Sequence, residues 1–241
     1  MSTARLLIVQ TGTAAEVLRR AHGDYPDWFS QSLGRPLPVL RAHEGEKLDR
    51  AALDRFKPDG IIVTGSPLSV TERAPWMLDL GHALLDAGAQ GIPVLGVCFG
   101  HQLLARCAGG DVIKNPRGRE IGTVKVSLTR KGRRDPLFAW CEGEVLESQT
   151  THVDAVDPLP PRAVVLAGNE NTPAQAFRLS ETLAGVQFHP ELSAAAMRAL
   201  IDSRRAKLAA DGMDAGALVK DVRETPAGQL LRAFERQAAH A

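Results

Sequence analysis

A chain of 241 residues, 44% of them hydrophobic, is long enough to bury the core of one large α/β domain. Its 29 lysines and arginines nearly balance its 28 aspartates and glutamates, which argues against a nucleic acid or an anionic membrane as a partner. No run approaches the roughly 18 apolar residues of a membrane helix, and the first residues lack a secretory pattern. We therefore expect a cytoplasmic protein. Its three cysteines lack CxxC spacing and predict neither a disulfide framework nor a zinc site.

Short apolar runs that are typical of strands alternate with helical patterns along the first half of the chain. This βαβαβαβα order predicts a parallel sheet with helices on both faces. Residues 120–190 are dense in strand-like runs, so we expect them to add antiparallel hairpins. In chain order, strands are expected at Leu6–Gln10, Leu37–Arg41, Gly60–Thr64, Ile92–Val97, Thr123–Leu128, Glu144–Gln149, Ala163–Ala167, Ala176–Leu179 and Leu183–Phe188, and helices at Ala14–Arg20, Asp27–Leu33, Leu48–Phe56, Pro75–Ala87 and His101–Cys107.

From Leu192 onward the apolar residues lie at helical spacing. We expect residues 1–191 to form the main domain and residues 192–241 to form a helical C-terminal extension packed on it. A role in covering the sheet, or in a subunit contact, is favoured for this extension over a role in binding substrate.

The segment Gly96–Gln102 carries the first chemical signal, because it joins a strand-like run to a helix-like stretch. A strand, a sharp turn flanked by glycines and then a helix form a nucleophile elbow, here with Cys98 at the position usually described for serine. A cysteine beside a helix N-terminus is favoured as the thiolate, which is the reactive form. The alternative is an unreactive cysteine buried in a glycine-rich turn.

A second segment, Gly185–Glu191, supplies a base for that thiol. Positions two apart on an extended strand share a face, so Glu191 can orient the imidazole of His189. A thiol nucleophile needs such an oriented base to collect its proton and to return it to the leaving group. His101 is not favoured as the base, since a position three residues past Cys98 on the helix points away from the thiol.

Together these segments resemble the two signature blocks of the class I (triad-type) glutamine amidotransferases. Two further segments agree with that family: Ile61–Val70 resembles its oxyanion-hole loop, and Thr150–Val156 resembles a segment that holds the backbone groups of glutamine. The subgroup that is most similar contains stand-alone proteins related to the amidotransferase domain of GMP synthetase. The resemblance implies an open, mixed but mostly parallel flavodoxin-like sheet, with helices on both faces, a small antiparallel addition and a helical tail.

The resemblance also implies roles for individual residues. Cys98, His189 and Glu191 would form the catalytic triad, and backbone N–H groups of Gly65, Ser66 and Phe99 would form the oxyanion hole. Gln102 lies one helical turn beyond the thiol and either reaches the substrate or is an ordinary first-turn residue. His152 and Asp154 alternate on one face, so they either line the pocket or pair with each other. The candidates for substrate binding are Gln102, Thr151, His152 and Asp154.

The predicted reaction is hydrolysis of the side-chain amide of glutamine through a Cys98 γ-glutamyl thioester, with release of ammonia. The chain has no GxxxxGK[ST] phosphate loop, so the ammonia would go to a separate synthetase subunit. One alternative is a γ-glutamyl peptidase that uses the same triad, and another is a non-catalytic binding domain. We expect no cofactor and no metal, because Cys98, His101, His152 and His189 lack the spacing of metal ligands. The charged segment Pro116–Gly122 departs from relatives that often carry an aromatic residue there.

Overall fold

The computed structural model of the protein describes residues 3–240. Its strands are β1 (Leu6–Gln10), β2 (Val39–Arg41), β3 (Gly60–Val63), β4 (Val94–Val97), β5 (Val112–Lys114), β6 (Glu120–Leu128), β7 (Val145–His152), β8 (Asp154–Val156), β9 (Val164–Gly168), β10 (Ala176–Arg178) and β11 (Leu183–Val186). Its α-helices are α1 (Glu16–His22), α2 (Tyr25–Leu33), α3 (Arg50–Phe56), α4 (Pro75–Ala89), α5 (Phe99–Cys107), α6 (Ala194–Ser203), α7 (Arg205–Ala210), α8 (Ala215–Asp221) and α9 (Gln229–Ala238).

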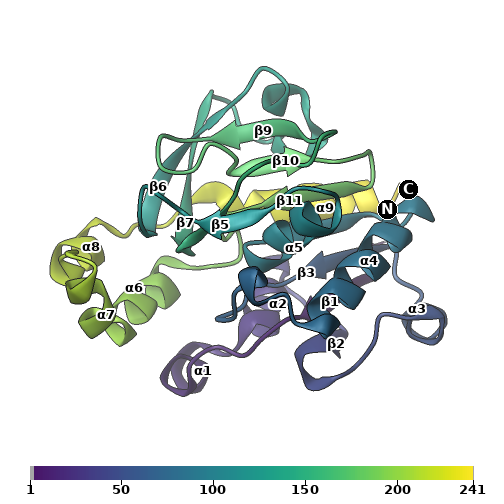
Figure 1. Ribbon diagram of the computed structural model, residues 1–241, viewed down its shortest axis with the longest axis horizontal. Coiled ribbons are helices and arrows are strands. Elements are labelled where there is room, and N and C mark those ends of the chain that lie inside the picture. Colours follow the sequence, from purple (N-terminus) through teal and green to yellow (C-terminus); the bar gives the residue numbers. More distant parts are fainter. Residues whose placement is uncertain (1–2, 241) are drawn as a thin grey trace.

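The main sheet has the strand order β2-β1-β3-β4-β11-β10-β9-β6-β7, and β5 pairs with β8 in a small second sheet. Strands β2, β1, β3, β4 and β11 run parallel to one another. From β11 onward each neighbouring pair is antiparallel. The predicted mixed, mostly parallel sheet with an antiparallel addition is therefore confirmed (Figure 1).

Alternation of side chains along the strands divides the core into two clusters on opposite faces of the sheet. Leu6 and Ile8 point into one cluster, and Leu7 and Val9 point into the other. Helices α2 and α9 cover the first face, whereas α3, α4 and α5 cover the second. All of these strand residues are fully buried, which is why the parallel strands read as continuous apolar runs in the sequence.

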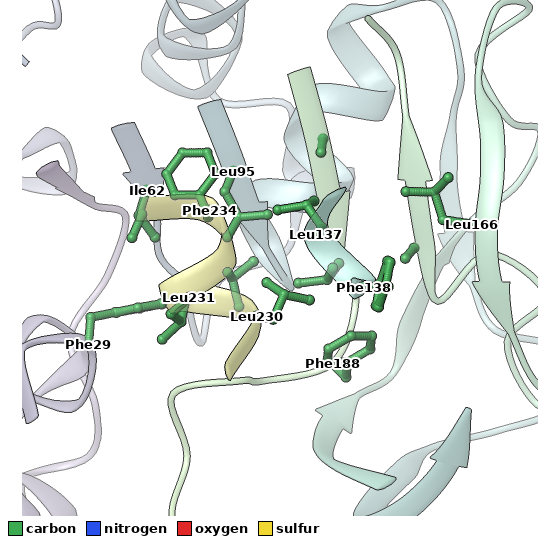
Figure 2. Packing of buried hydrophobic residues seen from close by; sticks show 14 of the residues in the cluster. Phe29, Ile62, Leu95, Leu137, Phe138, Leu166, Phe188, Leu230, Leu231 and Phe234 are labelled. Carbon is green, nitrogen blue, oxygen red and sulfur yellow. The ribbon is translucent and has the colours of Figure 1, made fainter. Parts of the chain in front are cut away.

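The C-terminal helices follow two different paths. Helix α9 packs on the central strands, and Figure 2 shows Phe234 beside Ile62 and Leu95. Helices α6, α7 and α8 instead join α1 and α2 in a third apolar cluster beside the sheet (Figure 1). Helix α9 thus covers a face of the sheet, and α6 and α8 contact strand β6. The division of the chain at residue 191 remains a prediction.

The remaining differences from the sequence-based expectation are local. The short strands β5 and β8 were not expected, because three residues show no usable periodicity. Helix α2 begins at Tyr25 rather than Asp27, since Asp24 accepts a hydrogen bond from the backbone N–H of Tyr25 and forms a capping box with Asp27. None of the helices described within residues 3–240 combines the length and apolar character that crossing a membrane requires.

Candidate active site

Three neighbouring parallel strands bring the predicted site together. Strands β3, β4 and β11 are adjacent, and Val97 of β4 is in register with Val186 of β11. Gly65, Cys98 and His189 each lie one to three residues past the end of one of these strands. Parallel strands end at the same edge of a sheet, so the loop, the thiol and the imidazole lie in one row. This topology explains how residues 91 positions apart in the sequence meet.

Cys98 has the backbone conformation of a nucleophile elbow. Its φ of 51° and ψ of −99° lie in a region that non-glycine residues rarely adopt, and it is the N-cap of α5. The flanking glycines permit this turn, because a Cβ at Gly96 would lie 2.5 Å from the carbonyl of Gly100. A Cβ at Gly100 would lie 2.8 Å from Val63, so Gly100 allows a close approach to β3.

His189 and Glu191 form a buried pair beside the thiol. The Nδ1 atom of His189 lies 2.6 Å from Oε1 of Glu191, and both side chains are shielded from solvent. Within residues 3–240 the Nε2 atom of His189 is buried and has no hydrogen-bond partner. Burial alone would lower the pKa of His189, but the negative charge of Glu191 and the interaction with Cys98 outweigh it and raise this pKa to about 10. The surroundings of the ring therefore favour its protonated form.

The loop after β3 closes over this pair. A Cβ at Gly65 would lie 2.9 Å from Cε1 of His189 and 3.6 Å from Cβ of Cys98, so a side chain there would displace the imidazole. The Gly65 carbonyl accepts hydrogen bonds from the hydroxyls of Thr11 and Thr64, which fixes the loop. Among the described residues, the backbone N–H groups of Gly65, Ser66 and Phe99 have no protein acceptor. These groups are free to donate to a ligand.

Each of the four candidate substrate residues lines a cavity of about 520 Å³ that also contains Cys98. The carbonyl of Thr151 lies 4.0 Å from the Cys98 sulfur. Gln102 donates from its amide nitrogen to the Asp154 carbonyl and to the side chain of Gln187, both at 3.0 Å. Its amide donors are therefore occupied, and its side-chain oxygen is the group left for a ligand.

His152 and Asp154 do not pair through their side chains. The ring nitrogens of His152 contact the Asp154 carbonyl oxygen and the Glu120 carboxylate, each at 3.0 Å. The Asp154 carboxylate instead accepts a hydrogen bond of 2.5 Å from the Ser69 hydroxyl. His152 thus has no free ring nitrogen, and it supports the cavity wall.

Sequence reasoning missed a group of cavity residues that includes Tyr25, Arg119 and Arg204. Tyr25 begins α2, Arg119 precedes β6, and Arg204 joins α6 to α7. Burial and then the negative charge of Cys98 raise the pKa of Tyr25, so its hydroxyl keeps its proton. The unusual charges noted in the segment 116–122 were the one signal that pointed to Arg119. Helical spacing after residue 192 gave no such signal for Arg204.

No cluster of three or more His, Cys, Asp and Glu side chains with the arrangement of metal ligands is found within residues 3–240. His101 is buried against Phe177, with a ring-centroid distance of 4.4 Å. Burial lowers the pKa of His101 to about 3, so this histidine is neutral in the core.

Solved structures share this arrangement of sheet and helices. A glutamine amidotransferase from Thermotoga maritima superposes with a TM-score of 0.77 at 23% identity, covering 98% of this chain and 99% of that one. A glutamine amidotransferase from Methylobacillus flagellatus gives a TM-score of 0.68 at 24% identity, covering 99% and 92% of the two chains. At such identities the likeness shows a common fold.

The sequence itself establishes the family. Residues 30–204, more than half of the chain, match the model of the class-I glutamine amidotransferases, so the protein belongs to that family. A glutamine-hydrolysing GMP synthase from Thermomicrobium roseum is 37% identical over 175 residues, which cover 70% of this chain and 31% of that protein. A second, from Trichormus variabilis, is 39% identical over 70% of this chain and 30% of that protein. The chain thus spans about a third of the length of these relatives.

Proposed function

We propose that the protein hydrolyses the side-chain amide of glutamine through a γ-glutamyl thioester on Cys98. The observation that carries this proposal is the row of Gly65, Cys98 and His189 at one edge of the sheet, with Nε2 of His189 unpartnered beside the thiol. A nucleophile, an oriented base and free backbone donors are the three parts that amide hydrolysis by a thiol requires.

The first half of the reaction forms the thioester. The Cys98 thiolate adds to the amide carbon, and the carbonyl electrons move onto oxygen to give a tetrahedral oxyanion. Free N–H groups of Gly65, Ser66 and Phe99 would stabilise that charge, each donor contributing about 3 kcal/mol. The carbon–nitrogen bond then breaks while Nε2 of His189 gives its proton to the departing nitrogen, which leaves as ammonia.

The second half releases glutamate. His189 is now neutral, and its Nε2 removes a proton from water as the water oxygen attacks the thioester carbon. The carbon–sulfur bond breaks, which regenerates the thiolate and the imidazolium. Glu191 holds Nδ1 of His189 at 2.6 Å in both halves and stabilises the cationic ring.

The released ammonia would serve an acceptor on another protein. The relatives named above are GMP synthases, and this chain spans about a third of their length. We propose that a separate synthetase subunit, which activates an acceptor with a nucleotide, receives the ammonia from this chain.

The direct test measures ammonia release from glutamine by the wild-type protein, by Cys98→Ala and by the control Cys141→Ala. Cys141 lies in a loop, where its thiol contacts the Gly143 carbonyl at 3.6 Å. We expect Cys98→Ala to lose all measurable turnover and Cys141→Ala to keep it. Mass spectrometry of rapidly quenched wild-type protein should show a γ-glutamyl adduct on Cys98. Turnover by Cys98→Ala would reject this nucleophile, and glutamine binding without turnover by wild type would favour the non-catalytic alternative.

A further inference from the structure

A second cavity, of about 860 Å³, lies at the edge of the sheet opposite to Cys98. Residues 179–181 line it and lead into the start of β11, whereas Cys98 follows the end of β4. Strands β4 and β11 run parallel, so these two ends lie at opposite edges of the sheet. The two cavities share no lining residue within residues 3–240. A volume of this size is typical of small-molecule sites.

The wall of this second cavity carries a surplus of positive charge. Its cations are Arg130, Lys131, Arg134 and Arg178, and its carboxylates are Asp135 and Glu181. Arg178 and Asp135 bind each other, with the two carboxylate oxygens engaged at 2.5 and 2.7 Å. Within residues 3–240 the other three cations form no ion pair. The balance that remains is three cations against one carboxylate.

Arg178 supports the cavity wall and is not available to a ligand. Its Nε and Nη2 atoms donate to Asp135, and its Nη1 atom donates to the carbonyls of Ser180 at 3.4 Å and Glu181 at 2.9 Å. These bonds occupy four of the five N–H donors of a guanidinium. Anion binding in this cavity would therefore depend on the other three cations.

The turn that carries these three cations is fixed on β9. A Cβ at Gly132 would lie 1.9 Å from the carbonyl oxygen of Leu166, so this close approach requires glycine. Thr129 donates to the same carbonyl from its backbone N–H at 2.8 Å, and its hydroxyl donates to the Val165 carbonyl at 2.9 Å. The turn is therefore ordered before any ligand arrives, which reduces the entropy lost on binding.

Apolar side chains complete the wall beside the cations. Leu166, Leu179 and Pro136 line the cavity together with Val164, which begins β9. Val164 is one of the few large apolar side chains that stay exposed, with 42% of its surface accessible. A ligand that covered Val164 would remove apolar surface from water. The cavity thus fits an anion that has an apolar body better than it fits a bare inorganic ion.

The charge balance indicates the kind of anion. A phosphate monoester carries a charge of about −1.5 to −2 at neutral pH, which matches a surplus of three cations over one carboxylate. Guanidinium groups also bind phosphate oxygens through parallel hydrogen bonds, and a lysine adds a point charge. A single carboxylate would leave part of this positive charge uncompensated.

Independently of the proposed Cys98 chemistry, we infer that this cavity is a binding site for a phosphate monoester with an aromatic or aliphatic body. The phosphate binds to Arg130, Lys131 and Arg134, and the body covers Val164. This site goes beyond the proposed glutamine hydrolysis, because it lies at the other edge of the sheet.

The test is titration calorimetry of the full-length protein with 1-naphthyl phosphate, inorganic phosphate and 1-naphthol. We expect 1-naphthyl phosphate to bind at least about tenfold more tightly than either fragment, since each fragment keeps only one kind of contact. The double variant Arg130→Gln/Arg134→Gln should weaken this binding at least about tenfold, because it removes two charge-assisted contacts. The matched control is Arg133→Gln. Arg133 lies in the same turn but pairs with Glu144 and does not line the cavity.

A second variant tests the apolar part of the site. Val164→Ser should weaken the binding of 1-naphthyl phosphate about threefold or more and leave the binding of inorganic phosphate unchanged. Urea denaturation and ammonia release from glutamine should match the wild type in all of these variants, which shows that the fold is intact.

Four results would overturn the inference. They are no binding of 1-naphthyl phosphate at millimolar concentration, unchanged affinity in the double variant, equal weakening in Arg133→Gln, and tighter binding of a deca-glutamate peptide than of 1-naphthyl phosphate. The last result would assign the cavity to an acidic protein segment. Because calorimetry needs no turnover, a failure of glutamine hydrolysis would leave these binding results unaffected, and the two proposals can fail separately.

Discussion

Two buried histidine–glutamate pairs lie near the same end of the sheet, and they differ in one nitrogen. His189 contacts Glu191 through Nδ1 at 2.6 Å, and its Nε2 has no hydrogen-bond partner within residues 3–240. His152 contacts Glu120 through Nε2 at 3.0 Å, and its Nδ1 contacts the Asp154 carbonyl at 3.0 Å. A buried carboxylate alone therefore does not mark a histidine as a candidate base. The Nε2 atom without a hydrogen-bond partner is what distinguishes His189 from His152.

The largest effect is expected when the imidazole of His189 is removed. We expect His189→Ala to lower kcat/KM for glutamine by at least about a thousandfold, because general acid–base catalysis by a histidine contributes about 10²–10⁴ and this one also stabilises the thiolate. Steady-state ammonia release measures the effect. A loss below about tenfold would mean that another group moves the proton.

A smaller loss is expected when the carboxylate of the same pair is replaced. Glu191→Gln keeps an oxygen that can accept from Nδ1 of His189 but removes the negative charge. In hydrolases with this type of triad, losing the carboxylate costs less than losing the base. We expect the kcat/KM of Glu191→Gln to be about ten- to a hundredfold higher than that of His189→Ala. Equal losses in the two variants would show that Glu191 does more than orient and stabilise the ring.

Replacing Glu120 in the second pair should change the stability of the protein more than its rate of glutamine hydrolysis. Glu120 accepts hydrogen bonds from His152 and also from Asn169 at 2.6 Å and Gln175 at 2.5 Å. Glu120→Gln removes the charge that three donors share, so we expect the free energy of unfolding to fall by about 1–3 kcal/mol. Urea denaturation measures this change. A rate loss as large as that of Glu191→Gln, with unchanged stability, would contradict the distinction between the two pairs.

The most gradual effects are two opposite dependences of stability on pH. The pKa of His189 is raised from 6.5 to about 10, so its contribution to stability is complete below pH 6.5 and is lost as the pH rises toward 10. The pKa of His101 is lowered to about 3, so the unfolded chain binds its proton first and stability falls as the pH falls from 6.5 toward 3. Each slope is at most about 1.4 kcal/mol per pH unit.

Urea denaturation at a series of pH values separates these two slopes. His189→Ala should flatten the alkaline side, and His101→Leu should flatten the acid side. Unchanged slopes in both variants would show that neither ring titrates differently in the folded and unfolded chains.

Much of the fold and of the candidate site could be predicted because their signals are local. Apolar runs predicted β1 with its observed bounds, and the glycines around Cys98 predicted the elbow. The positions of His189 and Glu191 two residues apart predicted their pairing, and the 2.6 Å contact confirms it. Each of these inferences needed only a few neighbouring residues.

Three donor-bearing residues of the cavity wall could not be predicted in this way. Tyr25, Arg119 and Arg204 come from three distant parts of the chain, and they meet because α1 and α2 pack on α6, α7 and α8. Such packing depends on which apolar helix faces contact one another in the folded chain. The sequence shows that apolar faces exist but not how they are paired. An ordinary arginine after a helix has no local pattern that marks it as a cavity residue.

The position of α9 has a consequence for how the chain reaches its native state. This helix follows every strand in the chain, yet Leu230, Leu231 and Phe234 cover the face formed by residues such as Ile62 and Leu95 (Figure 2). During synthesis part of this apolar face of the sheet therefore stays uncovered until α9 has left the ribosome. Exposed surface of this kind attracts chaperones and favours aggregation. We expect nascent chains that stop before α9 to depend on chaperones in a way that full-length chains do not.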